Sequence, residues 1–409
     1  MKKMELSSLL SKFGSKPGLG RIKKILKRLG NPEKKLKVIL VTGTNGKGSV
    51  TSYLSSILRE AGYKIGSFYS PHILRYNERY KINGKEISDS KLKKYQDIIL
   101  RLYQKEEYAM TEFEALTAIA YKYFYDEKCD YVVMEVGMGG RLDACNAAHE
   151  KIAIITNVEL EHTQWLGKTI EKISYEKAGI LKKGIGITGA DGKALEVIEK
   201  IAKRRRRKLF SIGKNFFIKN INADEKGTGF DYFGNKMFKN IKLKMLGNYQ
   251  AENCSLAIKA SELLRINEKY IKKGVFNARI TGRMEILNRK PLIVADVAHN
   301  PDGTKQLMKN IDIFKYKKLI IIFGVMKTKD WKKMLKSING KAKEIIFPKL
   351  KYYNSENPNR LKKYLKKGKI TKNCKEALKI AKKMAKKEDL ILITGSIYFL
   401  GEFLESVKI

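Results

Sequence analysis

The sequence predicts an α/β fold in two parts: an N-terminal domain with a mostly parallel sheet and a phosphate-binding loop (P-loop type), and a smaller Rossmann-like C-terminal domain. Two observations carry this prediction. Near-continuous apolar runs alternate with helical patterns before residue 210, and the same alternation restarts at about residue 284. Apolar strands without a polar face are typical of parallel sheets that helices cover on both sides.

The N-terminal elements follow from residue patterns. Residues 36–43, 130–137 and 151–158 are apolar runs and are predicted to be buried strands. Residues 49–62 and 113–127 have helical character, and Gly62 ends the first of these two helices. Because the strands are expected to be parallel, their carboxyl ends meet at one sheet edge, where open sheets of this kind bind ligands.

The residue pattern changes after residue 210. Residues 216–246 are predicted to form short antiparallel strands with Gly and Asn turns, followed by a helix over 248–264. Residues 277–287 show little regularity and are interpreted as an interdomain joint. Strands of the second domain are predicted at 291–298, 318–325, 342–347 and 389–396. We therefore expect one domain over residues 1–280 and a second over 284–409.

The charge of the chain leaves several partner classes open. The 409 residues carry 85 basic against 42 acidic side chains, a net charge of +43, and the densest basic run is "KRRRRK" at 203–208. Such charge is typical of nucleic-acid binders, but here it is spread along the whole chain. A lysine-rich solvated surface, or a field that attracts polyanionic small molecules such as ATP, explains it equally well.

The sequence predicts a cytoplasmic protein without membrane contact. It has no apolar run near 18 residues, and its first residues, "MKKMELSSLLSKFG", contain no adequate apolar segment for a signal peptide. The four cysteines lie far apart and suggest neither a disulfide framework nor a metal-ligand pair.

The stretch "VILVTGTNGKGSVTS" (38–52) predicts a phosphate site. Its spacing differs from the general loop, because two residues instead of four separate Gly43 from Gly46, and Gly48 lies between Lys47 and Ser49. A strand, a glycine turn and a helix nevertheless aim backbone N–H groups at one point. Lys47 would reach the outer phosphates, and Ser49 would either cap the helix or meet magnesium. The alternative is a plain turn with a serine cap.

Two further strand ends carry polar groups. Glu135 lies inside an apolar strand before a glycine-rich exit, where a carboxylate is costly unless it is paired or bound to a cation. The alternative for Glu135 is an ion pair with Arg141. His162 follows the third strand, and its alternative is simple packing. Together with the loop, these two residues predict a magnesium–nucleotide site.

Three other positions are candidates. Lys177 lies in a short helical segment before a glycine, and its alternative is an ordinary surface lysine. Asp296, His299 and Asn300 follow a strand of the second domain and would face the first domain across a cleft. Their alternative is an Asn-Pro-Asp-Gly turn held by local side-chain hydrogen bonds.

An ordered set of motifs then identifies a family resemblance. "TGTNGKGS", "SPHI", "NERYKING", "EVGMGGRLDACN", "EKAGI", "GNYQAEN", "TGRMEI" and "DVAHNPDG" occur in this order. The chain thereby resembles folylpolyglutamate synthase/dihydrofolate synthase, the folate branch of the Mur ligase superfamily, over nearly its whole length. Gly48 after Lys47 resembles this branch, whereas cell-wall Mur ligases normally have Thr or Ser there. Glu161 stands where aspartate is more typical.

The resemblance implies ATP-dependent amide formation. Magnesium-ATP would phosphorylate a carboxylate of dihydropteroate or of a folate glutamyl tail, and the amine of L-glutamate would attack the acyl phosphate. We expect a monomer that binds ATP, L-glutamate and dihydropteroate or folate. The nearest alternative is a Mur-type ligase acting on a cell-wall precursor. A nucleic-acid-binding protein with an inactive nucleotide fold is an alternative of another class, which the intact Lys47, Glu135, His162 and Lys177 disfavour.

The resemblance also implies roles for individual residues. The catalytic ones would be Lys47, His162 and Lys177, the last carboxylated by carbon dioxide so that its carbamate supplies an oxygen to a second magnesium ion. ATP contacts would come from Asn45, Gly46, Lys47, Gly48, Ser49, Asn253, Arg283 and Asp296. The magnesium ligands would be Ser70, Glu135, His162 and carboxylated Lys177. The pterin or folate would contact Gly18, Leu19, Gly20, Arg21, Thr111, Glu112, Phe113 and Glu114. His299 and Asn300 would complete the site from the C-terminal domain.

Overall fold

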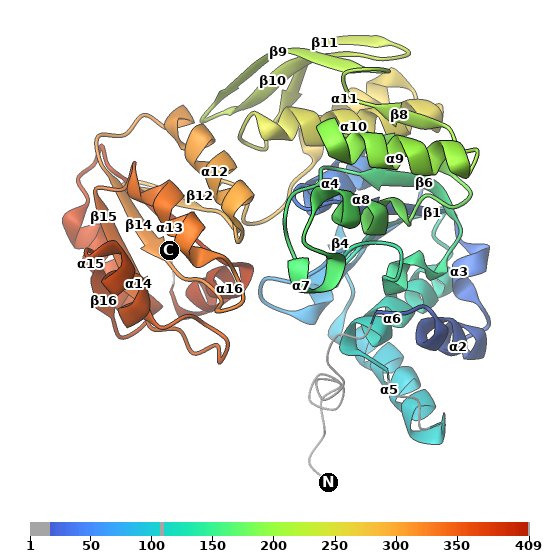
Figure 1. Cartoon of the computed structure of the whole chain (residues 1–409), viewed down its shortest axis with the longest axis horizontal. Helices are drawn as coiled ribbons and strands as arrows, with labels where there is room; N and C mark the ends of the chain where they lie inside the picture. The colour runs from blue at the N-terminus through green and yellow to red at the C-terminus, as the bar shows by residue number, and fades with distance from the viewer. Residues whose placement is uncertain (1–16, 107–109, 408–409) are drawn as a thin grey trace.

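The computed structural model describes residues 17–106 and 110–407, and its first part is built on an eight-stranded sheet (Figure 1). The strand order is β4-β3-β2-β5-β1-β6-β7-β8. The strands are β1 (Val38–Thr42), β2 (Ile65–Phe68), β3 (Tyr80–Ile82), β4 (Lys85–Glu86), β5 (Tyr131–Glu135), β6 (Glu150–Ile155), β7 (Ile185–Thr188) and β8 (Leu209–Ser211). All neighbouring pairs from β2 to β8 are parallel, and only β3 runs in the opposite direction, antiparallel to both of its neighbours, β2 and β4. The predicted mostly parallel sheet is confirmed.

Helices cover both faces of this sheet because its central strands are apolar on both sides. Successive side chains of a strand point to opposite faces, so Val38 and Leu40 join one core while Ile39 and Val41 join the other. The first core contains residues of α2 (Gly20–Arg28), α6 (Glu112–Asp126), α8 (Ile170–Ala178) and α9 (Gly192–Arg204). The second contains residues of α4 (Lys47–Glu60), α10 (Tyr249–Leu263) and α11 (Glu268–Asn277). The shorter α3 (Pro32–Lys35) and α7 (Thr163–Leu166) and the longer α5 (Asp89–Glu106) complete the first part.

A small antiparallel sheet follows, as the turn-rich sequence predicts. It consists of β9 (Phe217–Asp224), β10 (Gly227–Phe233) and β11 (Met237–Leu243), with β10 in the middle. Phe230, Tyr232 and Phe238 bury its inner face in the core that α10 shares. The sheet therefore covers the outer side of α10 (Figure 1).

The second part is an α/β sheet with strand order β12-β13-β17-β14-β15-β16. The strands are β12 (Glu285–Arg289), β13 (Leu292–Ala295), β14 (Leu319–Phe323), β15 (Glu344–Pro348), β16 (Lys369–Thr371) and β17 (Leu390–Thr394). Only β12 is antiparallel to its neighbour. The helices are α12 (Pro301–Asn310), α13 (Trp331–Asn339), α14 (Pro358–Leu365), α15 (Cys374–Met384) and α16 (Ile397–Ser406). The parallel core with covering helices confirms the Rossmann-like prediction.

One boundary within this region differs from the expectation. The sequence predicts an irregular joint over residues 277–287, but β12 begins at Glu285 and pairs with β13. Asn277 in turn is the last residue of α11. An edge strand acquires its conformation from the hydrogen bonds of its neighbour, which the local residue pattern does not reveal.

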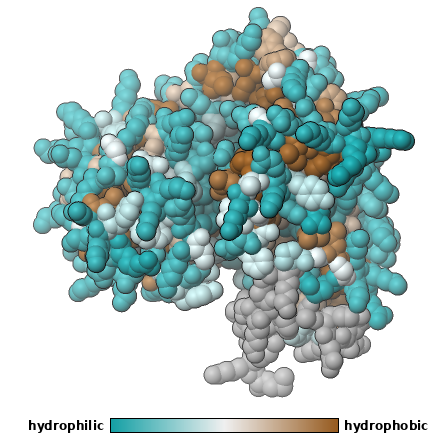
Figure 2. Space-filling view, in the orientation of Figure 1, coloured by the Kyte–Doolittle hydropathy of each residue, from teal (hydrophilic) through white to brown (hydrophobic). Residues whose placement is uncertain are grey.

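The cysteines lie in the interior, and the visible surface is mostly hydrophilic. Within the two described ranges, no helix is long and apolar enough to cross a membrane. Cys129, Cys145, Cys254 and Cys374 are all buried and free. Hydrophilic residues cover most of the face seen in Figure 2, as expected of a chain with a net charge of +43.

Candidate active site

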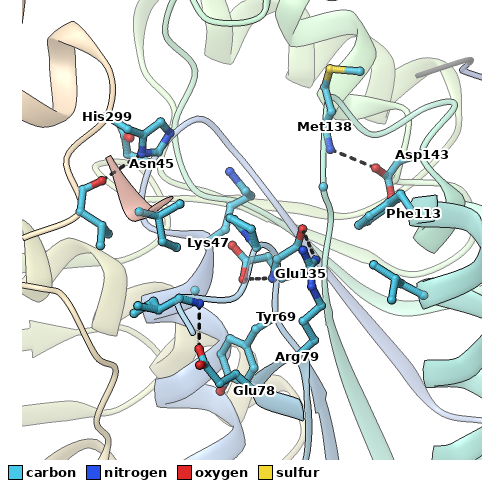
Figure 3. A pocket seen from close by; sticks show the side chains of 18 of the residues that line it. Asn45, Lys47, Tyr69, Glu78, Arg79, Phe113, Glu135, Met138, Asp143 and His299 are labelled. Atoms are coloured by element: carbon cyan, nitrogen blue, oxygen red, sulfur yellow. Dashed lines mark hydrogen bonds between the residues drawn. The ribbon is translucent and has the colours of Figure 1, made fainter. Parts of the chain in front are cut away.

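A cavity of about 1140 Å³ lies where the two parts of the chain meet. Its walls come from the loop after β1, from the residues that follow β2, β5 and β6, and from the C-terminal segments around His299, Lys329 and Ser396. Figure 3 shows Asn45 and His299 at one side, Lys47 and Glu135 in the middle, and Phe113, Met138 and Asp143 at the other side. The strand ends that the sequence predicts to share one edge thus border one cavity.

The glycine loop directs the N-terminus of α4 into this cavity. Gly46 is the N-cap of α4 and has φ +82°, a left-handed conformation that favours glycine. The ammonium of Lys47 is held by the carbonyl oxygens of Gly43 at 3.1 Å and Thr44 at 3.0 Å. Ser49 is the third residue of α4, is buried, and does not line the cavity. Of the two roles expected for Ser49, the helix cap is wrong, because α4 begins two residues earlier and Gly46 is its N-cap; the magnesium contact stays a prediction.

Contacts from β6 and α10 fix the conformation of the loop. Asn157 accepts hydrogen bonds through Oδ1 from the N–H of Asn45 at 2.9 Å, and Thr156 donates to the Asn45 carbonyl at 2.5 Å. A Cβ placed on Gly46 would lie 2.1 Å from Oδ1 of Asn253, so Asn253 packs directly on the loop. Thr156 and Asn157 were not singled out in the sequence, and their only signal is their position directly after β6.

Glu135 is a buried carboxylate without a cationic partner within 4 Å among the described residues. Its Oε2 accepts a hydrogen bond from the N–H of Ser70 at 3.1 Å. Burial raises the pKa of Glu135, while the charges of Lys47 and Arg283 act in the opposite direction. The alternative of a pair with Arg141 is wrong, because Arg141 binds Glu176 at 2.8 Å instead.

Gly48, the residue that distinguishes this loop from the general pattern, is where Glu135 approaches α4. A Cβ on Gly48 would lie 2.8 Å from Cδ1 of Ile280 and 3.4 Å from Oε2 of Glu135. A serine or threonine at this position would therefore need Ile280 to move. The glycine lets the carboxylate lie beside the first turn of the phosphate loop helix.

Arg79 is a site residue that the sequence reasoning missed. Its guanidinium is buried, donating to Nδ1 of His72 at 2.9 Å and to Oγ of Ser70 at 3.2 Å. Burial, together with the charge of Arg79, lowers the pKa of His72 to about 4, so this imidazole is neutral and accepts the hydrogen bond. The only sequence signal for Arg79 is its place in the motif "NERYKING".

Glu161 is a second missed residue, and it connects the two domains. Its Oε1 lies 3.2 Å from Nε2 of His299, 2.9 Å from Nζ of Lys329 and 4.0 Å from Nε2 of His162. Burial alone would raise its pKa, but the hydrogen bond of His299 and the charges of His299 and Lys329 hold the pKa of Glu161 well below its usual range. The sequence signal was its position beside His162.

The histidine and the lysine of the expected metal set differ in accessibility. The His162 side chain is 38% exposed and lines the cavity, so simple packing does not explain it. Burial lowers the pKa of His162 to about 4. Lys177 is 4% exposed, so it is not a surface lysine, although it does not line the cavity either. Burial, followed by the charge of Lys47, lowers the pKa of Lys177 to about 7.

The C-terminal candidates meet the phosphate loop. Nδ2 of Asn300 donates to Oδ1 of Asn45 at 3.0 Å, and Nδ2 of Asn45 donates to Asp302 at 2.9 Å. Oδ1 of Asn300 also caps α12 by accepting a hydrogen bond from the N–H of Gly303 at 2.7 Å, so the local side-chain bond expected of a turn is the cap of a helix, and it coexists with the contact to Asn45. Asp296 is buried behind the cavity, where it accepts hydrogen bonds from two backbone N–H groups. Arg283 and His299 line the cavity, whereas Asp296, Asn300 and Asn253 do not.

Some of the residues expected to contact the pterin or folate line the cavity, and others do not. The cavity is lined by Gly18, Thr111, Glu112, Phe113 and Glu114, but not by Leu19, Gly20 or Arg21. The reason is that α2 begins at Gly20, and Arg21 contacts the site indirectly by binding Glu114 at 3.0 Å.

Asp143 is a further missed residue in this part of the cavity. It is buried, and it accepts hydrogen bonds from the N–H groups of Met138 at 3.0 Å and Cys145 at 2.9 Å. Burial raises the pKa of Asp143 to about 6.

Comparison with known proteins identifies the family. Residues 41–261 match the Mur ligase middle domain, and residues 282–397 match the Mur ligase, glutamate ligase domain. The dihydrofolate synthase/folylpolyglutamate synthase of Bacillus subtilis is 34% identical, over 97% of this chain and 96% of the relative. This chain belongs to the dihydrofolate synthase/folylpolyglutamate synthase family. It is therefore an ATP-dependent ligase of the Mur superfamily.

Solved members of this family have the same fold. Escherichia coli FolC in complex with DHPP and ADP is 29% identical with a TM-score of 0.90, covering 99% of this chain and 98% of that one. A bifunctional folylpolyglutamate synthase/dihydrofolate synthase with Mn, AMPPNP and L-glutamate bound is 26% identical with a TM-score of 0.88, covering 97% and 96%. The family assignment thus agrees with the motif order and with the architecture.

The electrostatics of the cavity suit the nucleotide chemistry of this family. A helix N-terminus and Lys47 attract an anion, while the buried Glu135 carboxylate beside them calls for a cation. Arg79 and Arg283 also line the cavity and supply further positive charge close enough to Glu135 to act on its pKa. A polyphosphate together with a divalent cation satisfies all of these groups at once.

Proposed function

We propose that this ligase adds L-glutamate to dihydropteroate, to glutamylated tetrahydrofolate, or to both, through an acyl phosphate. The observation that carries the proposal is the approach of Glu135 to Gly48 beside the phosphate loop, inside a cavity that both domains line. A cell-wall Mur ligase is disfavoured because the curated relative and the solved neighbours are folate enzymes.

In the first step, the acceptor carboxylate attacks the γ-phosphorus of ATP, and the bond from this phosphorus to the ADP oxygen breaks. The N–H groups at the start of α4 and the Lys47 ammonium hold the phosphates and stabilise the charge that spreads over their oxygens. In the second step, the glutamate amine attacks the acyl carbon, phosphate leaves, and the amine loses a proton. No enzyme nucleophile is needed, and the reaction depends on positioning.

The residues present fit a magnesium ion. Magnesium is usually held by one or two carboxylates, by substrate phosphates and by water. Glu135 supplies the carboxylate, and Ser70 and His162 line the same cavity. Within the described ranges, no group of three or more His, Cys, Asp or Glu side chains would hold a metal on its own. When bound, the ion would neutralise phosphate charge.

Lys177 also fits the carbamate that we propose for it. A buried amine with a pKa of about 7 is partly uncharged at neutral pH, whereas an ordinary lysine is not. The neutral amine adds to the carbon of carbon dioxide, one C=O electron pair moves to oxygen, and a proton leaves to solvent. The carbamate turns a buried cation into an anion that would serve as an oxygen ligand.

The remaining substrates are assigned by the chemistry of the walls. We place the pterin part of the acceptor beside Phe113 and Asp143, because an aromatic ring and a buried carboxylate suit a planar heterocycle with N–H donors. We place glutamate near His299, on the domain that matches the glutamate ligase family. We further propose a cytoplasmic location and a domain division into residues 1–280 and 284–409, since α11 ends at Asn277 and β12 begins at Glu285.

One experiment tests this function. Purified protein with ATP, magnesium and L-glutamate should release ADP only when dihydropteroate or tetrahydrofolate is added, and comparison of the two acceptors determines the preference. Release with a uridine-linked muropeptide and with neither folate acceptor would contradict the proposal. Filter binding of RNA and DNA at physiological salt tests the nucleic-acid alternative, since nonspecific affinity falls steeply with salt.

A further inference from the structure

Part of the basic run at 203–208 forms hydrogen bonds with the protein's own backbone. It ends α9 and leads into β8, and its members alternate in exposure. Lys203, Arg204, Arg206 and Lys208 are exposed, whereas Arg205 and Arg207 are partly buried. Arg207 donates to the carbonyl of Lys183 at 2.8 Å. Half of the arginines that suggested a nucleic-acid partner therefore bind the chain itself.

Arg205 binds the backbone directly after Lys177. Its Nη1 is 2.5 Å from the carbonyl oxygen of Leu181, 3.3 Å from that of Gly179 and 3.4 Å from that of Ala178. Ala178 is the last residue of α8, and its carbonyl also accepts the N–H of Leu181 at 3.1 Å. Gly179 is the C-cap and Leu181 lies beyond the helix end, where carbonyls lack the regular helical hydrogen bond. A guanidinium with several donors satisfies such carbonyls and favours the negative end of the helix dipole.

A second arginine holds the residue directly before Lys177. The N–H of Arg141 donates to the carbonyl of Glu176 at 2.7 Å, and its guanidinium binds the Glu176 carboxylate at 2.8 and 3.0 Å. Asn146 adds a hydrogen bond to the carbonyl of Gly179 at 3.3 Å. Gly140 lies so close that a Cβ on it would be 2.8 Å from the carbonyl oxygen of Lys177. We call residues 176–181 the lysine turn.

Lys177 itself has little else to fix its position. Its side chain is buried, but its ammonium makes no hydrogen bond with any residue in the described part of the chain. A lysine has four rotatable bonds, and helix ends fray readily. Fixing the backbone therefore fixes the point from which the buried side chain extends, which narrows the positions that its amino group can reach.

We propose that Arg205 and Arg141 are positioning residues that hold the lysine turn from both sides, so that the Lys177 amine is fixed where its carbamate is needed. This inference rests on the proposed function, in which Lys177 is carboxylated. It gives Arg205, one of the two partly buried arginines of the basic run, a positioning role in the ligase reaction. A carbamate that must present an oxygen within bonding distance of a cation tolerates little displacement, since a shift of about 1 Å costs roughly 100-fold in rate.

The test compares two arginines of the same run. R205A removes the guanidinium that binds the lysine turn, whereas R204A removes the same charge from the exposed last residue of α9. Each protein is incubated with ¹³C-bicarbonate, and the carbamate carbon of Lys177 is measured by NMR, with K177A as the blank. ADP release with folate acceptors and the melting temperature are measured in parallel. R205K keeps the positive charge but replaces the planar guanidinium, whose N–H groups bind the carbonyls of the lysine turn.

We expect R204A to match the wild type in both carbamate signal and rate. R205A should lose more than half of the carbamate signal and roughly 100-fold in kcat, with part of the rate restored by acetate or formate. R205K should have a carbamate signal and a kcat between those of R204A and R205A. If R205A does not fold, R205K replaces it in the comparison. A purely structural role would lower the melting temperature while leaving the carbamate signal unchanged.

Two results overturn the inference, and they are distinct from failure of the proposed function. If folded R205A and R205K have the carbamate signal and the rate of the wild type, the lysine turn does not need Arg205 to position Lys177. An active wild type without any carbamate signal would remove the group that is to be positioned. A wild type that releases no ADP with any folate acceptor would instead refute the proposed function itself.

Discussion

A methyl group on Gly46 should damage the phosphate loop by a clash that the structure defines. Gly46 has φ +82°, and an added Cβ would lie 2.1 Å from Oδ1 and 3.0 Å from Cγ of Asn253. Gly213 has the same φ of +82° with nothing within 4 Å of an added Cβ. G213A thus measures the backbone cost alone, while G46A adds the displacement of Asn253.

The two costs can be separated in magnitude. A left-handed conformation costs an alanine about 1–2 kcal/mol, and this applies to both variants. Forcing a packed side chain to move costs about 1–3 kcal/mol more, which applies to G46A only. We therefore expect G46A to lose about 2–5 kcal/mol of unfolding free energy and G213A about 1–2 kcal/mol. Affinity for ATP should fall in G46A and stay unchanged in G213A.

Calorimetric unfolding measures the stability of each variant, and titration with ATP measures its affinity. The substitution N253A is the control for the clash between the added Cβ and Asn253. Removal of the Asn253 side chain in the G46A background should restore most of the extra stability loss, since contacting residues are not additive. ATP affinity should remain low in this double variant because the proposed Asn253 contact is gone. Equal stability losses in G46A and G213A, or no recovery in the double variant, would refute this reasoning.

Three further predictions follow from the site. K47A should abolish ADP release while leaving the fold intact by circular dichroism, because the loop loses its charge at the phosphates; retained turnover would contradict this role. K177A should also lose ADP release, and added short carboxylates should restore part of it. In the wild type, the carbamate signal should rise between pH 6 and pH 8, because the Lys177 amine loses its proton as the pH passes its pKa of about 7. E161A should release His299 and Lys329, so X-ray scattering should show a larger radius of gyration; an unchanged radius would show that other contacts hold the domains together.

Local patterns were sufficient for the framework of the site. Apolar runs located the central strands, and the parallel order brought the ends of β1, β5 and β6 to one edge. Edge elements were harder, because β12 and β16 take their conformation from neighbouring strands. The cap of α4 is hard to predict for a related reason, since its start depends on the left-handed backbone of Gly46 and not on the capping side chain of Ser49.

The sequence by itself determined the fold class, the phosphate loop and the family, because periodicity, glycine spacing and motif order are properties of neighbouring residues along the chain. Only the tertiary structure decided the partners of the charged groups. Arg141 binds Glu176 and leaves Glu135 for a cation, Glu161 meets His299 and Lys329 of the other domain, and Arg205 turns inward. Charge attraction does not depend on sequence distance, so each side chain pairs with whichever group the packed backbone brings within reach.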